Sequence, residues 1–153
     1  MAPIKRHIAL QSISHDHHFG LLLCWKIKTG LNKGIDPARI KKFCNFFYEI
    51  HLNNHFIAEE KYIIPVLDKD DELIKQAMKE HHLLRKLFED VQVNIQNLTL
   101  IEKHLEEHIR FEERELFKMI EDVATEEQLL AIGNIKQEDV KTIESWKDEF
   151  WVK

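Results

Sequence analysis

Residues 51–64 read HLNNHFIAEEKYII, and residues 104–117 read HLEEHIRFEERELF. Both stretches open with His-Leu, place a second histidine four residues later, and continue after four more residues with a Glu-Glu pair. In an α-helix, side chains four positions apart lie on one face, about one turn from each other. The inner histidine and the first glutamate of each stretch can therefore point at the same spot. These residues are His55 and Glu59 in the first stretch and His108 and Glu112 in the second.

Each of the two stretches is preceded in the chain by a shorter segment, and these two segments also match each other. Each segment is an acidic residue followed by two histidines, and the two segments are Asp16-His17-His18 and Glu80-His81-His82. The chain thus reads as two copies of a helix pair, in which the first helix offers one histidine and the second offers His-x-x-x-Glu. Because neighbouring residues differ by about 100° around a helix, only one histidine of each pair can face the interior, and spacing alone leaves that choice open.

Apolar residues recur at three- and four-residue spacing through most of the chain, and helix breakers fall between these stretches. No segment shows the sustained alternation of a β-strand. We predict four long helices, running from Ser14–Asp16 to about Gly30, from Asp36-Pro37 to about Pro65, from Asp68–Asp71 to about Ile95, and over about 100–122 after a break at Asn97–Thr99.

Two shorter helices are predicted after the fourth long one. Thr125 and Gln128 have the spacing of a capping box that opens a helix ending before Gly133, and an amphipathic pattern indicates a last helix at about 138–151. We therefore expect an all-α protein, an up-down four-helix bundle with additional short C-terminal helices. The chain should form a single domain over 1–153, with the bundle at about 10–122 and the C-terminal extension at about 125–153.

The composition argues against several classes of partner. The 153 residues include 22 Lys and Arg against 27 Asp and Glu, a formal net charge of −5, which does not favour binding to nucleic acid or to an anionic membrane. No apolar run has the length of a signal peptide or a membrane span, so we expect a cytoplasmic protein. Cys24 and Cys44 each lie among apolar residues and are expected to be buried and reduced.

Four imidazoles and two carboxylates on inward helix faces predict a pair of metal ions, because carboxylates can bridge two cations and offset their charge. Six protein ligands cannot fill two six-coordinate ions, so positions remain for solvent, an oxo or hydroxo bridge, or a small ligand such as dioxygen. Mixed nitrogen and oxygen ligands favour two non-haem iron ions, with manganese or zinc less favoured. A structural zinc site more usually recruits cysteine and closes at four ligands.

The segments SHDHHFGLLL, HFIAEEKYIIPVL, KEHHLLRKL and HIRFEERELFKMIE resemble the four signature helices of the hemerythrin-like, HHE cation-binding domain family, over roughly residues 10–122. The resemblance implies a four-helix bundle that holds a non-haem di-iron centre. It also implies that Glu59 and Glu112 bridge the metals, and it favours the first histidine of each pair. Carried over residue by residue, the implied metal ligands are His17, His55, Glu59, His81, His108 and Glu112.

One departure from the family bears on function. Oxygen-carrying hemerythrins have His-x-x-x-His on the third helix, whereas here Arg85 stands four residues after His81. The pattern is closer to that of the di-iron proteins of iron–sulfur cluster repair and of an iron-sensing hemerythrin-like domain. We expect a sensor, scavenger or iron-linked protein that binds dioxygen or a related small ligand. The alternative is a di-iron enzyme of cluster repair or of oxygen, peroxide or nitric-oxide chemistry.

Several residues near the predicted ligands keep more than one interpretation. His51 and His104 precede the ligand histidines by one turn, so each can be a seventh ligand, an outer partner of a ligand, or a histidine at the surface or core edge. Glu60 and Glu113 are expected to form solvated ion pairs, although Glu113 has the five-residue spacing of the carrier's aspartate. The aromatic C-terminal helix can close the bundle or form a homodimer contact.

Overall fold

The computed structural model describes residues 6–135 and 140–152, and every regular element within these ranges is helical. None of the described helices is both long enough and apolar enough to cross a membrane. In chain order the elements are α1 (Ile8–Asn32), α2 (Pro37–Phe47), the π-helical turn η1 (Tyr48–Leu52), α3 (Asn53–Ala58), the π-helical turn η2 (Glu59–Ile63), the short 3₁₀ turn η3 (Ile64–Val66), α4 (Glu72–Glu89), α5 (Ile95–Phe111), the π-helical turn η4 (Glu112–Leu116), α6 (Phe117–Val123), α7 (Glu126–Gly133) and α8 (Val140–Glu144).

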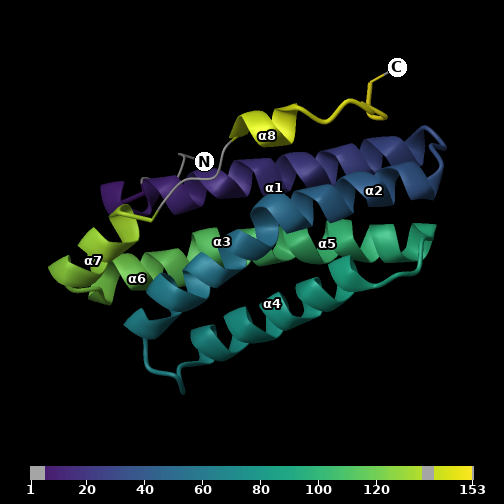
Figure 1. Ribbon diagram of the computed structural model, residues 1–153. Coiled ribbons are helices and arrows are strands. Elements are labelled where there is room, and N and C mark those ends of the chain that lie inside the picture. Colours follow the sequence, from purple (N-terminus) through teal and green to yellow (C-terminus); the bar gives the residue numbers. More distant parts are fainter. Residues whose placement is uncertain (1–5, 136–139, 153) are drawn as a thin grey trace.

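Four long rods run side by side and form the bundle (Figure 1). The first is α1, the second runs from α2 to η3, the third is α4, and the fourth runs from α5 to α6. Each rod contacts the next one in the chain, and the fourth contacts the first, so the bundle closes with up-down connectivity. Helix α7 packs against α1, and α8 packs against η1. This arrangement confirms the predicted all-α bundle.

Side-chain caps begin the second rod and α7 as the sequence predicted. Asp36 Oδ1 accepts a hydrogen bond from the backbone N–H of Ala38 at 3.0 Å, with Pro37 in the first turn. Thr125 and Gln128 form the predicted reciprocal capping box. Caps of this kind satisfy backbone donors that have no partner within the helix, and they set where the rods begin.

Three predicted helix boundaries are wrong, and at two of them a side chain other than the expected one caps the helix. Helix α1 begins at Ile8, capped by His7, and Ser14 and Asp16 lie inside it. Helix α4 ends at Glu89, well before Ile95. The break before the fourth rod lies at 90–94 and not at Asn97–Thr99, because Asn94 caps α5 by accepting the N–H of Asn97 at 2.7 Å.

The C-terminal helix is also shorter than predicted. It covers Val140–Glu144, and the chain then makes turns instead of continuing as a helix to 151, while positions 138–139 lie outside the described residues. The turns bring Trp146 and Trp151 against Phe43 of α2, with ring centroids 5.6 and 5.2 Å apart. The aromatic side chains of this segment therefore cover the side of the bundle at α2.

Two apolar clusters fill the bundle, one toward each end. The larger contains Leu23, Phe56 and Leu105 together with both cysteines, which are buried and free as predicted. The smaller contains Ile13, Ile63 and Phe117 among others. Along each rod, the histidines and glutamates singled out from the sequence lie where residues of one cluster give way to residues of the other. A polar layer therefore divides the core.

Candidate metal centre

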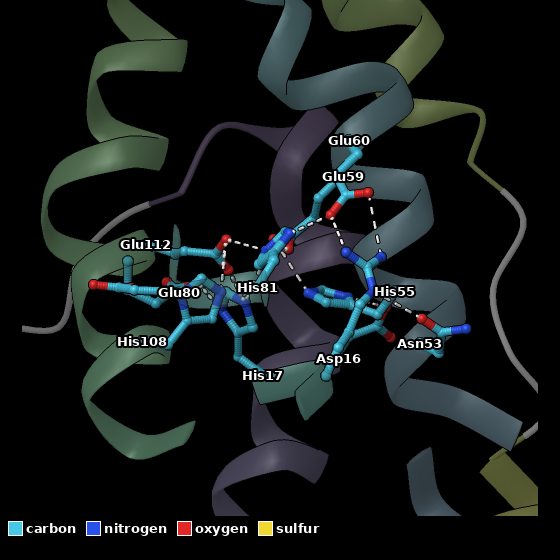
Figure 2. Close-up of polar contacts among 12 residues, drawn as sticks. Asp16, His17, Asn53, His55, Glu59, Glu60, Glu80, His81, His108 and Glu112 are labelled. Carbon is cyan, nitrogen blue, oxygen red and sulfur yellow. Dashed lines mark hydrogen bonds and ion pairs between the residues drawn. The ribbon is translucent and has the colours of Figure 1, made fainter. Parts of the chain in front are cut away.

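All four rods contribute to this polar layer, which lies deep inside the bundle (Figure 2). The structure brings together all six residues that the sequence proposed as metal ligands, and each is at most 5 % exposed. They are His17 on α1, His55 on α3, Glu59 at the start of η2, His81 on α4, His108 on α5 and Glu112 at the start of η4. The neighbouring histidines, His18 and His82, are exposed at the surface.

The six side chains form two groups of four that share both glutamates. In the first group, ligand atoms of His17, His55, Glu59 and Glu112 all lie within 4.8 Å of one another. In the second group the same limit holds for His81 and His108 with the same two glutamates. Two adjacent positions are thus each surrounded by two imidazoles and two carboxylates.

Each shared carboxylate directs its two oxygens to different groups. Glu59 Oε2 lies 3.2 Å from Nε2 of His55 in the first group, and Glu59 Oε1 lies 3.1 Å from Nε2 of His81 in the second. Glu112 repeats this arrangement, with one oxygen 2.8 Å from an imidazole nitrogen of the first group and the other 3.1 Å from one of the second. This is the disposition that a carboxylate needs to bridge two cations.

Buried polar atoms without hydrogen-bond partners are concentrated in this cluster. Such atoms are rare in folded proteins, because each one loses its hydration without compensation. Six of them converge here: Nε2 of His55, His81 and His108, both carboxylate oxygens of Glu59, and Oε2 of Glu112. Imidazole nitrogens and carboxylate oxygens are ligands that divalent transition metals prefer. The residues present therefore fit a metal pair, whose ions would satisfy these atoms.

A second layer of four carboxylates surrounds the four histidines. Each carboxylate accepts a hydrogen bond from Nδ1 of one imidazole, an assignment that leaves Nε2 of that ring facing the two central glutamates. Such partners orient metal-binding histidines and raise their basicity. The four pairs are His17 with Glu113 at 2.7 Å, His55 with Asp16 at 3.0 Å, His81 with Glu60 at 2.7 Å, and His108 with Glu80 at 2.6 Å.

The outer carboxylates follow the internal duplication of the chain. The acid that precedes each histidine pair accepts a hydrogen bond from the histidine of the His-x-x-x-Glu motif in its own half of the chain. The second glutamate of each Glu-Glu pair accepts a hydrogen bond from a histidine in the other half. The expectation that Glu60 and Glu113 form only solvated ion pairs is therefore wrong. The repeated acidic positions were visible in the sequence, but which imidazole each one reaches was not.

Arg85 supports one of these outer carboxylates. Its guanidinium donates to both oxygens of Glu60, at 2.6 and 3.2 Å, and its Nε donates to Asn53 Oδ1 at 3.2 Å. Paired donation of this kind fixes the plane of the carboxylate. The residue that stands where oxygen carriers have a further histidine thus acts here on Glu60, and through it on the orientation of His81.

A feature with no evident sequence signal is the π-helical turn that follows each His-x-x-x-Glu motif. Turn η2 begins at Glu59 and η4 begins at Glu112. Such turns insert one extra residue into a helix and are frequent at functional sites. In both turns the two successive glutamates reach histidines of the cluster, although adjacent residues of a regular helix point about 100° apart.

The carboxylates dominate the electrostatics of the histidines. Burial by itself would lower the pKa of each imidazole, but the hydrogen bonds and charges of the nearby glutamates and Asp16 outweigh it. The pKa is raised to about 9 for His17 and His108, to about 10 for His55 and to about 11 for His81. In return, the imidazoles hold the pKa of Glu112 well below its usual range despite burial. A metal ion entering the cluster must therefore displace protons.

Comparison with known proteins agrees with this geometry. The profile of the hemerythrin HHE cation binding domain matches residues 8–120, which span almost the whole bundle and all six central residues. No curated protein and no solved structure matches the chain. The family match and the buried histidine–glutamate cluster together indicate a metal-binding domain.

Proposed function

Because the chain belongs to the hemerythrin HHE cation-binding domain family, we propose that its buried cluster holds two iron ions and binds dioxygen or a related small ligand. The observation that supports this most directly is the pair of four-residue groups that share Glu59 and Glu112. A single ion would leave one of the two groups, with its partnerless buried atoms, unexplained.

In this proposal, His17 and His55 would hold one ion, His81 and His108 would hold the other, and the two glutamates would be shared between them. Each ion then receives two nitrogens and two oxygens from the chain, fewer than the six ligands that iron commonly takes, so a small ligand has room to bind. When bound, the iron pair supplies reversible redox chemistry toward that ligand.

The residues around the proposed ligands orient the imidazoles, balance positive charge and exclude water. The four outer carboxylates hold the Nδ1 protons and keep every Nε2 directed inward. Together with the two glutamates they offset positive charge that would be costly in a buried layer. The apolar clusters on both sides exclude bulk water from the site.

The donor set supports iron over zinc. Structural zinc sites usually use cysteine, and both cysteines of this chain lie in the larger apolar cluster, outside the group of six. Two buried free thiols also agree with a reducing compartment such as the cytoplasm. With Arg85 in place of the carrier's additional histidine, we assign the protein to sensing, scavenging or iron-linked binding.

Metal analysis and an optical spectrum test the proposal. Protein purified after iron supplementation should contain about two irons per chain, as two groups of ligands require, with an absorption band that changes when oxygen is added. His55→Ala and His108→Ala should lower the iron content, whereas His18→Ala and His82→Ala, at exposed positions, should not. A colourless, iron-free protein would refute the proposal, and rapid peroxide turnover or restoration of a damaged iron–sulfur protein would assign it to the enzyme class.

A further inference from the structure

Two arginines contact the outer carboxylates that follow the two bridging glutamates. Arg85 donates to both oxygens of Glu60, and Arg6 contacts Glu113. Arg6 stands just before the cap of α1 and is only 9 % exposed. Its Nη2 donates to the backbone carbonyl of Glu113 at 2.6 Å and lies 3.6 Å from Oε1 of the same residue. Each π-helical turn that carries a Glu-Glu pair is thus held by one arginine.

The two halves of the chain supply these arginines from positions that do not correspond. When the two histidine pairs are aligned, Leu21 takes the place of Arg85 in the first half, and Asp70 takes the place of Arg6 in the second. Both of these residues are exposed. The same kind of contact is therefore reached twice from unrelated positions, which points to a role at the outer glutamates that the internal duplication does not explain.

Arg6 contacts two neighbours of the His17 ring. Glu113 Oε2 accepts a hydrogen bond from Nδ1 of His17 at 2.7 Å, and a second one from Ser14 Oγ at 2.7 Å. The ring of Phe117 stacks on His17, with centroids 5.3 Å apart and an interplanar angle of 15°. The guanidinium carbon of Arg6 lies 5.8 Å from the centroid of this Phe117 ring. One side chain therefore contacts both the carboxylate and the aromatic ring that orient His17.

The contact of Arg6 with the backbone extends its reach to a bridging glutamate. Glu113 lies in η4 directly after Glu112, which is shared by both groups of ligands. A hydrogen bond from a charged donor is stronger than one between neutral groups, so the bond to the Glu113 carbonyl limits how far this turn can shift. Arg6 also pairs through Nη1 with Glu121 of α6, at 2.9 Å. The guanidinium thus joins the start of the first rod to the part of the fourth rod that carries the ligands.

Stability alone is a poor explanation for this buried arginine. The side chains of Arg6 and Glu113 are 6 % and 24 % exposed, and the cost of removing such charges from water can exceed their attraction. A planar guanidinium, in contrast, directs several donors at fixed angles, which suits it to holding a carboxylate and a carbonyl in place. The arrangement therefore favours a role in geometry.

We propose that Arg6 is a positioning residue of the metal centre, which holds Glu113 and η4 so that His17 presents Nε2 to the first metal position. Arg85 has the same relation to His81 at the second position. The inference rests on the proposed function, because His17 must bind a metal for its orientation to matter. It adds a residue that lies outside residues 8–120, the part of the chain that the family profile matches.

Proton NMR of zinc-loaded protein tests this role directly. The Nδ1–H of each inward histidine is held by a carboxylate, so its signal should lie downfield of the amide protons and report on that one hydrogen bond. Arg6→Met should shift the His17 signal and leave the His81 signal in place, whereas Arg85→Met should do the reverse. Arg110→Met, at an exposed position on α5, is the matched control and should shift neither signal.

Competition with a chelator measures the consequence for zinc binding. Arg6→Met should weaken binding about three- to tenfold, less than the loss of an outer carboxylate itself, because the arginine acts through Glu113. In a Glu113→Gln background, Arg6→Met should have little further effect, as a double-mutant cycle would show. Glu121→Gln removes the charge of the other partner of Arg6 and should shift the His17 signal less than Arg6→Met does.

The outcomes separate this role from a merely structural one and from failure of the proposed function. If wild-type protein binds neither zinc nor iron, the proposed function fails and the inference fails with it. If two zinc ions bind but Arg6→Met matches Arg110→Met, or if Arg6→Met and Glu121→Gln weaken binding equally with the His17 signal unmoved, the role of Arg6 is overturned while the metal centre stands. If Arg6→Met does not fold, Arg6→Lys, which keeps the charge but not the forked donors, should still shift the His17 signal, and an unchanged signal would overturn the assignment.

Discussion

Binding of two zinc ions at pH 7 should release about four protons from each chain. Zinc is the probe because it has no redox chemistry and takes the same imidazole and carboxylate ligands. The expectation follows from the cluster, where the pKa of all four inward histidines is raised to between about 9 and 11. Each imidazole therefore carries a proton on both nitrogens at pH 7, and a metal must replace the proton on Nε2.

The size of this effect makes it measurable. Each pKa unit above the working pH corresponds to about 1.36 kcal/mol, so deprotonating the cluster at pH 7 costs on the order of 10 kcal/mol. Metal binding must offset this cost, and the cost falls as pH rises. Zinc affinity, measured by competition with a chelator, should therefore increase steeply between pH 6 and pH 8.

Isothermal titration calorimetry in buffers of different ionisation enthalpy counts the protons directly. The slope of the apparent enthalpy against the ionisation enthalpy of the buffer is negative for proton release, and its magnitude equals the number of protons released. His18→Gln and His82→Gln alter exposed neighbours of cluster histidines and should leave the count unchanged. A wild-type count below about two would refute the reasoning, because the imidazoles would then be largely neutral before the metal arrives.

Three other perturbations have defined outcomes. Asp16→Asn should weaken metal binding about 10- to 100-fold in a chelator competition, because the carboxylate that orients His55 is lost. Asp70→Asn, at an exposed position, should leave the affinity unchanged. Equal affinities of the two variants would contradict the role of the outer carboxylates. Lys41→Met should lower the free energy of unfolding, measured in urea, by about 1–3 kcal/mol. The reason is that the buried ammonium donates hydrogen bonds to Leu87 O, Phe88 O and Asn97 Oδ1. A loss no greater than that of Lys42→Met, at an exposed position, would contradict this. In protein stripped of metal, the raised histidine pKa values stabilise the folded state. This stabilisation is complete below the unfolded pKa of 6.5 and is lost as pH rises through about 9 to 11, so the melting temperature should fall over this range. A melting temperature that does not change with pH would show that the histidines are not stabilised as cations.

Much of the bundle could be predicted from local pattern. The helical class follows from apolar spacing, and the starts of the second rod and of α7 follow from side chains that cap their own helices. Prediction failed where a potential cap had a distant partner instead. Ser14 donates to Glu113 and Asp16 bonds His55, so neither begins α1. Competition of this kind cannot be read from a short segment of sequence.

The residues of the candidate metal centre also include some that the sequence could predict and some that it could not. His55 with Glu59, and His108 with Glu112, were found because their spacing is one helical turn and occurs twice. The spacing could not choose between the histidines of the adjacent pairs, because that choice depends on how α1 and α4 are rotated about their axes. It also could not show that His51 is buried while His104 is not, since η1 interrupts only one of the two helices.

By itself, the amino-acid sequence determined that this chain forms helices and that two of them each carry an imidazole and a carboxylate on one face, because both properties depend on residues within a few positions of each other. Only the tertiary structure decided which histidines meet, that both glutamates span two groups, and which carboxylate holds which ring. The bonded histidine and outer carboxylate are 21 to 96 residues apart in the chain. Packing of the rods, which sets their rotation and register, is what brings such residues into contact.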